Sequence, residues 1–408
     1  MTSYPQSRTT AFFGWHVVAA TFVLAVFGWG VGFYGPPIYL QMVVQRTGWS
    51  VALVSAAVTL HFLVGAVVVA NLPRLYRLAG VTTAGAVLLA IGVVGWSIAS
   101  RPWNLFAAAV LSGAGWVAMG AAAVNAIIAL WFVQRRPAAL SMAYNGASVG
   151  GVVFSPLWVM LIAASGFAQA AVIVGISMVL VVGALSVVAF SKSPDALGQY
   201  PDGVGPQGGE SAPLSAAPTV RASLWRDRRF LTLAVGMAAG LFAQIGLLAH
   251  LFSIMVPVFG PQAAGLLMGG ATVAAIVGRT ALGWLMPASA DRRLIASASY
   301  GVQILGSLLL LATDAGSPAG AVIGILLFGL GIGNATSLPP LIAQVEFAKS
   351  DVSRVVPVIV AISQATYAFA PALFGIARTI SDPVLFIMAA AVQCLAVVAF
   401  LAGRQRRP

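Results

Sequence analysis

The sequence predicts an all-α membrane protein in which twelve transmembrane helices form two pseudo-symmetric six-helix bundles around a central cavity. Composition is the first observation behind this prediction. Of the 408 residues, 60% are hydrophobic and 7% are charged, whereas about a quarter of an ordinary soluble domain is charged. With 21 basic and 9 acidic residues, a soluble protein of this length would leave most of its surface apolar. The composition therefore excludes soluble enzymes and disordered chains.

Apolar runs of membrane-spanning length are the second observation. A helix needs about 20 apolar residues to cross the hydrocarbon core of a bilayer, and the sequence contains twelve such runs. None of them shows the alternating pattern of a transmembrane barrel strand. The runs cover residues 15–40, 51–73, 81–99, 104–132, 138–164, 168–190, 230–258, 262–286, 294–312, 319–345, 355–378 and 383–402.

The distribution of basic residues is the third observation, and it sets the orientation. With a cytoplasmic N-terminus, only Arg46, Arg101 and Arg378 fall on the outer side, and every other basic residue except Arg279 falls in a cytoplasmic segment. The positive-inside rule therefore predicts a multi-pass protein of the cell (inner) membrane with both termini in the cytoplasm. Because the basic residues are spread over short connections, the net charge of +12 does not indicate nucleic-acid binding.

One long polar segment divides the chain. Residues 191–229 are rich in Pro, Gly, Ser and charge, which is typical of a mobile linker. We expect this linker to be cytoplasmic and to join an N-terminal bundle, residues 1–190, to a C-terminal bundle, residues 230–408. A weak internal repeat fits two related halves, because Ser148 and Pro156 recur at the same spacing as Ser363 and Pro371.

Four short motifs carry a resemblance to a known family. GWS at residues 48–50 precedes the second run, WFVQRRPAALSMAYNGASVGG at residues 131–151 opens the fifth, SPDALGQYPDG at residues 193–203 begins the linker, and VGR at residues 277–279 lies in the eighth. With these motifs the chain resembles the major facilitator superfamily over nearly its whole length. Within that superfamily it is similar to the monocarboxylate transporter and oxalate–formate antiporter branch. The resemblance implies a secondary transporter that works by alternating access.

Arg279 is the strongest candidate for a substrate-binding residue. It lies near the middle of the eighth run, whereas all nine acidic residues lie in loops or at the ends of runs. An arginine at the bilayer centre costs about 2.5–3.5 kcal/mol even on the mild insertion scale. Since no acidic residue lies within a run to pair with it, we expect an anion from outside the protein, and a guanidinium fits a carboxylate with two parallel hydrogen bonds. The alternative is a structural arginine bonded to backbone carbonyls or water.

Two histidines are candidates for proton coupling, because an unperturbed histidine titrates near ~6.5. His250 lies in the outer third of the seventh run, where it would hydrogen-bond the substrate or carry a proton. Its alternative is a neutral histidine bonded to a backbone carbonyl at a helix break. His61 lies in the middle of the second run, and there we favour a structural role.

Other polar and aromatic residues at a similar depth complete the predicted site. The resemblance implies that the helices carrying them face the central cavity; the alternative for each is a contact between helices. Prolines beside these residues, Pro36, Pro37 and Pro371 among them, mark candidate kinks. The candidate substrate-binding residues are Tyr34, Asn125, Tyr144, Asn334, Gln364 and Tyr367.

These residues predict a transporter of a small organic anion. A monocarboxylate fits best, because one central cation favours a monoanion. Symport with a proton and antiport against another anion both remain open. One alternative is an exporter of a neutral or aromatic small molecule in which Arg279 is structural. Alternatives of another class are a non-transporting membrane sensor and a membrane-embedded enzyme.

An enzyme is the weaker interpretation of this sequence. Within the runs there is no nucleophile–base pair and no cluster of metal ligands, since His61, His250 and Cys394 are isolated from one another in the sequence. The nucleotide-binding pattern G-x-x-x-x-G-K-[ST] is absent, which makes a primary pump an unlikely interpretation. We therefore expect no cofactor, no metal and no obligate protein partner, and a lipid bilayer as the surroundings.

Overall fold

The computed structural model describes residues 12–75, 80–203, 224–287, 289–313 and 318–404. Regular structure in these segments is helical throughout, which confirms the predicted all-α class. The first seven α-helices are α1 (Gly14–Gly32), α2 (Pro36–Thr47), α3 (Val51–Leu75), α4 (Val81–Ile98), α5 (Pro102–Val117), α6 (Ala121–Trp131) and α7 (Arg136–Leu185). The others are α8 (Arg228–Leu285), α9 (Arg292–Ala312), α10 (Pro318–Glu346), α11 (Lys349–Tyr367), α12 (Ala370–Ile380) and α13 (Asp382–Ala402).

Ten helical segments of the described chain are long and apolar enough to cross a membrane. Three of them consist of two consecutive helices: α1 with α2, α5 with α6, and α11 with α12. The breaks fall at residues 33–35, 118–120 and 368–369. A break frees backbone polar groups, which at membrane depth are tolerated only inside the protein or along a water-filled cavity. The breaks therefore mark the protein interior rather than its lipid-facing surface.

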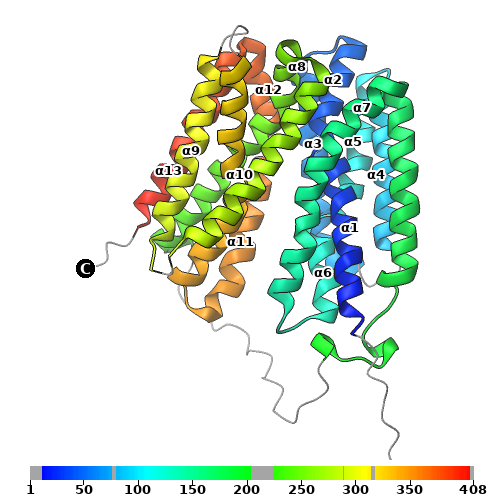
Figure 1. The fold of residues 1–408 in the computed structure, drawn as a ribbon, viewed down its shortest axis with the longest axis vertical. Coiled ribbons are helices and arrows are strands. Elements are labelled where there is room, and N and C mark those ends of the chain that lie inside the picture. Colours follow the sequence, from blue (N-terminus) through cyan, green and yellow to red (C-terminus); the bar gives the residue numbers. More distant parts are fainter. Residues whose placement is uncertain (1–11, 76–79, 204–223, 288, 314–317, 405–408) are drawn as a thin grey trace, which may run out of the picture.

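Gly166 and Gly260 interrupt the two longest helices, α7 and α8. Their φ angles are 80° and 74°, a region that glycine adopts without steric cost. Each glycine divides its helix into two arms, residues 136–165 and 167–185 of α7 and residues 228–259 and 261–285 of α8. In Figure 1 the chain of α7 turns back at the upper end of the molecule.

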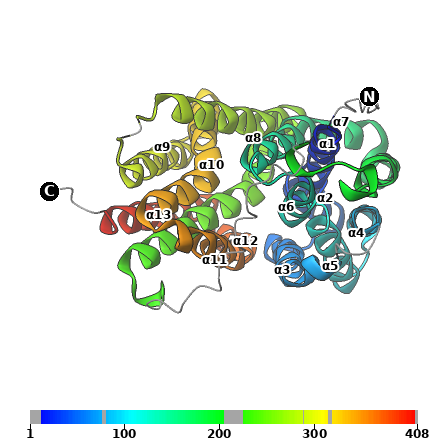
Figure 2. The same ribbon diagram turned by 90° about the horizontal axis from the view of Figure 1, so that it is seen from below.

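The helices lie in two groups, α1 to α7 and α8 to α13 (Figures 1 and 2). The groups contact each other through α3 with α12 and through α2 and α7 with α8. At this contact the Thr59 hydroxyl accepts a hydrogen bond from the Ala372 backbone N–H at 3.0 Å. A Cβ atom at Gly375 would lie 2.5 Å from the Ser55 hydroxyl, so the backbones are closely apposed there. At the opposite end, where α1 begins and α13 ends, the two groups separate (Figure 1).

The first part of the expected linker is ordered against the first group of helices. The Asp202 carboxylate accepts hydrogen bonds from the backbone N–H groups of Val133, Gln134 and Arg135 at 3.1, 2.8 and 3.1 Å. Burial raises the pKa of Asp202, but these donors outweigh burial and hold the pKa below its ordinary value. Residues 191–203 are thus a docked segment rather than mobile linker, whereas residues 204–223 lie outside the described part of the chain.

Candidate functional site

Arg279 lies on the second arm of α8 and points toward α10. Its Nε donates a hydrogen bond to the Gly333 carbonyl at 3.2 Å. The ion pairs of the described chain join Arg229 to Asp227, Arg293 to Glu346, Arg378 to Asp382 and Arg404 to Asp291. None of these pairs includes Arg279. Because a guanidinium carries several further N–H donors, most of its donor capacity is open to an anion.

Gly333 makes the approach of α10 to Arg279 possible. A Cβ atom at this position would lie 2.5 Å from the Ala275 carbonyl oxygen and 3.0 Å from Arg279 Nε. Any larger residue would therefore push the two helices apart. Sequence reasoning missed Gly333, because its role depends on which side of α10 faces α8.

Tyr34 brings the first group of helices to Arg279. It lies in the break between α1 and α2, its ring lies beside the Thr272 side chain, and it is near enough to Arg279 for an electrostatic interaction with the guanidinium. Gly151 of α7 packs against the same place, since a Cβ atom there would lie 2.6 Å from the Tyr34 ring and 2.8 Å from Thr272. Tyr34 therefore lies where the two groups contact each other, on the side of Arg279, and sequence reasoning missed Thr272 as its neighbour.

Asn125 and Tyr144 bond to each other within the first group. Asn125 Nδ2 donates to the Tyr144 hydroxyl at 2.6 Å and to the Ala121 carbonyl at 2.9 Å. The Tyr144 hydroxyl donates to the same carbonyl at 3.1 Å. In this conformation both side chains join helices, which is the alternative considered for them.

The remaining predicted cavity residues belong to the second group. Asn334 is 5% exposed, and its Nδ2 donates to the Ser299 hydroxyl at 3.1 Å, while its Oδ1 is buried without a partner among the described residues. Gln364 lies three residues before Tyr367 on α11, within one turn of the helix. The Tyr367 ring meets the edge of Phe62 of α3 at a centroid distance of 6.2 Å, so Tyr367 lies where the two groups touch.

His61 has both ring nitrogens occupied. Nδ1 lies 2.8 Å from the Ser112 hydroxyl and Nε2 lies 2.9 Å from the Gly32 carbonyl. Since a carbonyl only accepts, Nε2 carries a proton, and Nδ1 can accept from Ser112 in the neutral ring. The ring also stacks on Trp116. This geometry fits the structural role favoured for His61.

His250 is fully buried beside α12. Its Nε2 lies 3.0 Å from the Pro371 carbonyl, which is the structural alternative considered for this residue. Its Nδ1 has no partner among the described residues. The Arg378 guanidinium, which bonds to Ser253 and pairs with Asp382 at 2.9 Å, is near the ring. His250 lies at the contact between the two groups, because a Cβ atom at Gly375 would lie 3.5 Å from its Cε1 and 2.5 Å from the Ser55 hydroxyl of α3.

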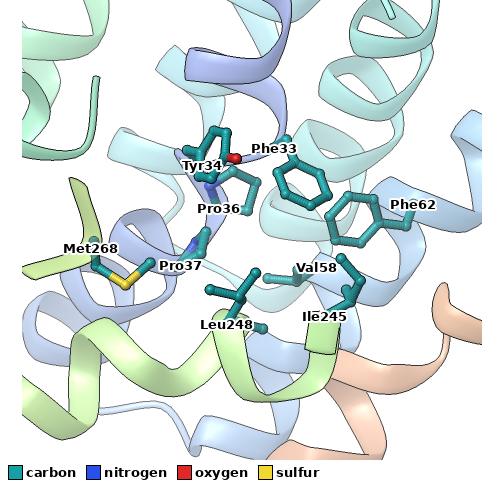
Figure 3. A pocket seen from close by; sticks show the side chains of 10 residues that line it. Phe33, Tyr34, Pro36, Pro37, Val58, Phe62, Ile245, Leu248 and Met268 are labelled. Carbon is teal, nitrogen blue, oxygen red and sulfur yellow. The ribbon is translucent and has the colours of Figure 1, made fainter. Parts of the chain in front are cut away.

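A small apolar cavity lies beside Tyr34 between the two groups (Figure 3). Its volume is about 20 Å³, and a water molecule needs roughly 10–15 Å³ by the same kind of measure. It can hold one water but no organic substrate. The cavity is lined by Phe33, Tyr34, Pro36, Pro37, Val58, Phe62, Ile245, Leu248, Ala249 and Met268.

The family of the chain follows from its sequence taken as a whole. The family model described as Major Facilitator Superfamily matches residues 18–371. The chain belongs to the major facilitator superfamily. This membership, together with ten membrane-length helices, makes it a multi-pass membrane protein and indicates a transporter rather than an enzyme. No group of three or more potential metal ligands occurs in the described residues.

Solved structures of other transporters share this superfamily fold. A bacterial homolog of the human lysosomal transporter Spinster, in an inward-facing and occupied conformation, is 15% identical, with a TM-score of 0.68 and 97% of each chain covered. The nucleoside transporter NupG is 13% identical, with a TM-score of 0.72 and coverage of 97% of this chain and 100% of that chain. Identities this low show the fold alone. Among curated proteins, none matches the sequence significantly.

Proposed function

We propose that this superfamily member is a secondary active transporter of a small organic anion, with a monocarboxylate as the best-fitting substrate. The observation that carries the proposal is Arg279, an intramembrane guanidinium without a carboxylate partner in the described chain. A charged group at that depth is costly unless it is paired. A substrate carboxylate supplies the missing partner through two parallel hydrogen bonds.

The position of Tyr34 suggests how binding is coupled to movement. Arg279 belongs to the second group of helices and Tyr34 to the first. An anion held by both side chains would draw the groups together around it, as alternating access requires. Tyr34 would donate a hydrogen bond from its hydroxyl to the anion. Asn125, Tyr144, Asn334, Gln364 and Tyr367 would line the cavity once the groups move.

A second candidate is an exporter of a neutral or aromatic molecule. It is favoured by the bond from Arg279 to the Gly333 carbonyl and by the aromatic side chains of Phe33 and Phe62 near Tyr34. Uptake into proteoliposomes separates the two candidates. We expect saturable uptake of labelled formate, lactate or pyruvate and none of a labelled nucleoside; the reverse result would favour the exporter.

We also propose the topology that the basic residues predict. If each arm of α7 and of α8 crosses the membrane separately, the ten helical segments make twelve crossings. Six of them would form an N-terminal bundle, residues 1–190, and six a C-terminal bundle, residues 230–408. Both termini and the linker, residues 191–229, would then lie in the cytoplasm beneath the inner membrane. The open end of the molecule would face inward.

Cysteine labelling tests this topology. Cys394 is the one native thiol, so a Cys394→Ala background removes competing reactivity. Tyr200 of the docked segment and Arg101 of the connection between α4 and α5 are both exposed. We expect an impermeant thiol reagent added to intact cells to label Arg101→Cys but not Tyr200→Cys. Labelling of Tyr200→Cys but not of Arg101→Cys would show that the topology is the reverse of the one proposed.

The pH dependence of uptake tests His250 as the proton-coupling residue. We propose that its unpartnered Nδ1 takes up a proton when the contact with α12 opens. His250→Gln should then keep substrate binding but flatten the profile of initial uptake rate between about pH 5 and about pH 8, the range in which histidines titrate.

His61→Gln is the matched control for this experiment. His61 is equally buried, but both of its ring nitrogens are bonded, so we expect lower thermal stability and an unchanged pH profile. If the pH profile of uptake by His250→Gln overlays that of the wild type, His250 has a structural role. An imposed pH gradient without counter-substrate would then decide whether the substrate carries the proton or the protein exchanges anions.

A further inference from the structure

A wide groove lies at one end of the second group of helices, away from Arg279. Its volume is about 1030 Å³. It is formed by the residues at which α8 and α9 begin and by those at which α10 and α13 end. Figure 2 shows α9 and α13 at the edge of the molecule that is farthest from the first group of helices. Its lining residues are Arg228, Ser289, Ala290, Asp291, Arg292, Arg293, Ile342, Val345, Glu346, Leu401, Ala402 and Arg404.

The groove has an excess of positive charge. Two of its four arginines are neutralised within the protein, because Arg293 pairs with Glu346 at 2.6 Å and Arg404 pairs with Asp291 at 2.7 Å. Arg292 donates only to a backbone carbonyl, that of Leu341, at 2.7 Å. Neither Arg292 nor Arg228 has a carboxylate partner among the described residues. Two guanidinium groups are therefore available to an anion.

Apolar side chains are exposed on the groove wall and at the end of α8, a few residues before Ser289 of the groove. Trp284 and Leu285, the last residues of α8, are 87% and 80% exposed, and Val345 on the groove wall is 58% exposed. Tryptophan is enriched where a membrane meets water, and an exposed leucine beside it is compatible with contact to lipid. In the topology proposed above, the groove would lie at the level of the lipid headgroups, with acyl chains beside it.

We propose that this groove binds the phosphate of an anionic phospholipid through Arg228 and Arg292. Guanidinium groups bind phosphate oxygens with charge-assisted hydrogen bonds, and basic pockets at the cytoplasmic ends of helices suit anionic headgroups. Free inorganic phosphate presents the same chemistry without acyl chains. The exposed apolar residues beside the groove favour the lipid.

Native mass spectrometry of the purified full chain tests the proposal with phosphatidylglycerol, phosphatidylcholine and inorganic phosphate as probes. We expect the wild type to bind phosphatidylglycerol about tenfold more tightly than phosphatidylcholine, since a charged hydrogen bond contributes about that much. The variant Arg228→Gln/Arg292→Gln should lose this preference. Arg228→Gln alone, at an exposed position, should lose part of it without any risk to folding.

A charge-matched double variant is the control. Arg136→Gln/Arg354→Gln also removes two exposed arginines but leaves the groove intact, so it should bind phosphatidylglycerol like the wild type. Equal binding by the two double variants would overturn the proposal, as would a wild type without preference for the anionic lipid. If inorganic phosphate bound as tightly as phosphatidylglycerol, and only the groove variant lost this binding, the groove would be an anion site. The proposal that its ligand is a lipid would then be wrong.

Discussion

Replacing Arg279 by alanine is expected to lower monocarboxylate uptake by roughly 30-fold or more. Removing one partner of a buried, hydrogen-bonded charge pair costs about 2–5 kcal/mol, and each 1.4 kcal/mol is about a tenfold change. The protein should still fold, because Arg279 makes one described hydrogen bond, to the Gly333 carbonyl. The measurement is the initial rate of labelled uptake into proteoliposomes, with thermal unfolding of the same preparation to verify the fold.

Two further variants make the Arg279 experiment specific. Arg279→Lys keeps the charge but loses the planar fork, so little uptake should remain. Arg354→Ala removes an exposed arginine and should transport like the wild type. Uptake by Arg279→Ala at the wild-type rate would mean that the arginine is structural, and the exporter of a neutral molecule would become the better proposal.

Replacing Arg293 by glutamine is expected to destabilise the protein by about 3 kcal/mol, the lower end of the range for a buried pair, because the Glu346 side chain, which is 15% exposed, loses the buried guanidinium that binds it. Arg293 is 1% exposed. It bonds both oxygens of Glu346, at 2.6 and 2.8 Å, and also the Arg229 carbonyl at 2.8 Å. This one side chain therefore holds together α8, α9 and α10. The measurement is the unfolding free energy in detergent, or the corresponding loss of thermal stability.

A neighbouring ion pair provides the control for Arg293. The side chains of Arg404 and Asp291 are 41% and 34% exposed, so Arg404→Gln should cost less than about 1 kcal/mol. Arg293→Met/Glu346→Leu should recover much of the loss, since an apolar pair avoids the uncompensated charge. If Arg293→Gln and Arg404→Gln destabilise the protein equally, the burial of Arg293 adds nothing to the stability that its ion pair with Glu346 contributes.

The sequence determined the features that follow from local composition. An all-helical membrane protein is predicted by the membrane-length apolar runs, the asymmetry of basic residues and the polar segment after residue 190. These features can be read from the sequence because a polar group in lipid is costly at whichever position it occurs. The same cost singles out Arg279. Pro36, Pro37 and Pro371 were recognisable as candidate kinks, and each lies in the first turn of a helix after a break. Pro156, by contrast, lies inside the first arm of α7 without a break.

Only the tertiary structure decided which side chains meet. Tyr34 was predicted as a substrate-binding residue from its depth in the first run, but only the structure shows that it lies beside Thr272 of the other group of helices. For His250 the sequence left a substrate or proton role and a bond to a backbone carbonyl both open, and only the structure shows that its Nε2 is bonded to the Pro371 carbonyl, far along the chain. Such partners depend on how each helix is rotated about its axis and on where glycines such as Gly333 allow close approach. Hydropathy predicts that a helix crosses the membrane. It does not predict how the helix is rotated about its own axis, because nearly every face of these helices is apolar.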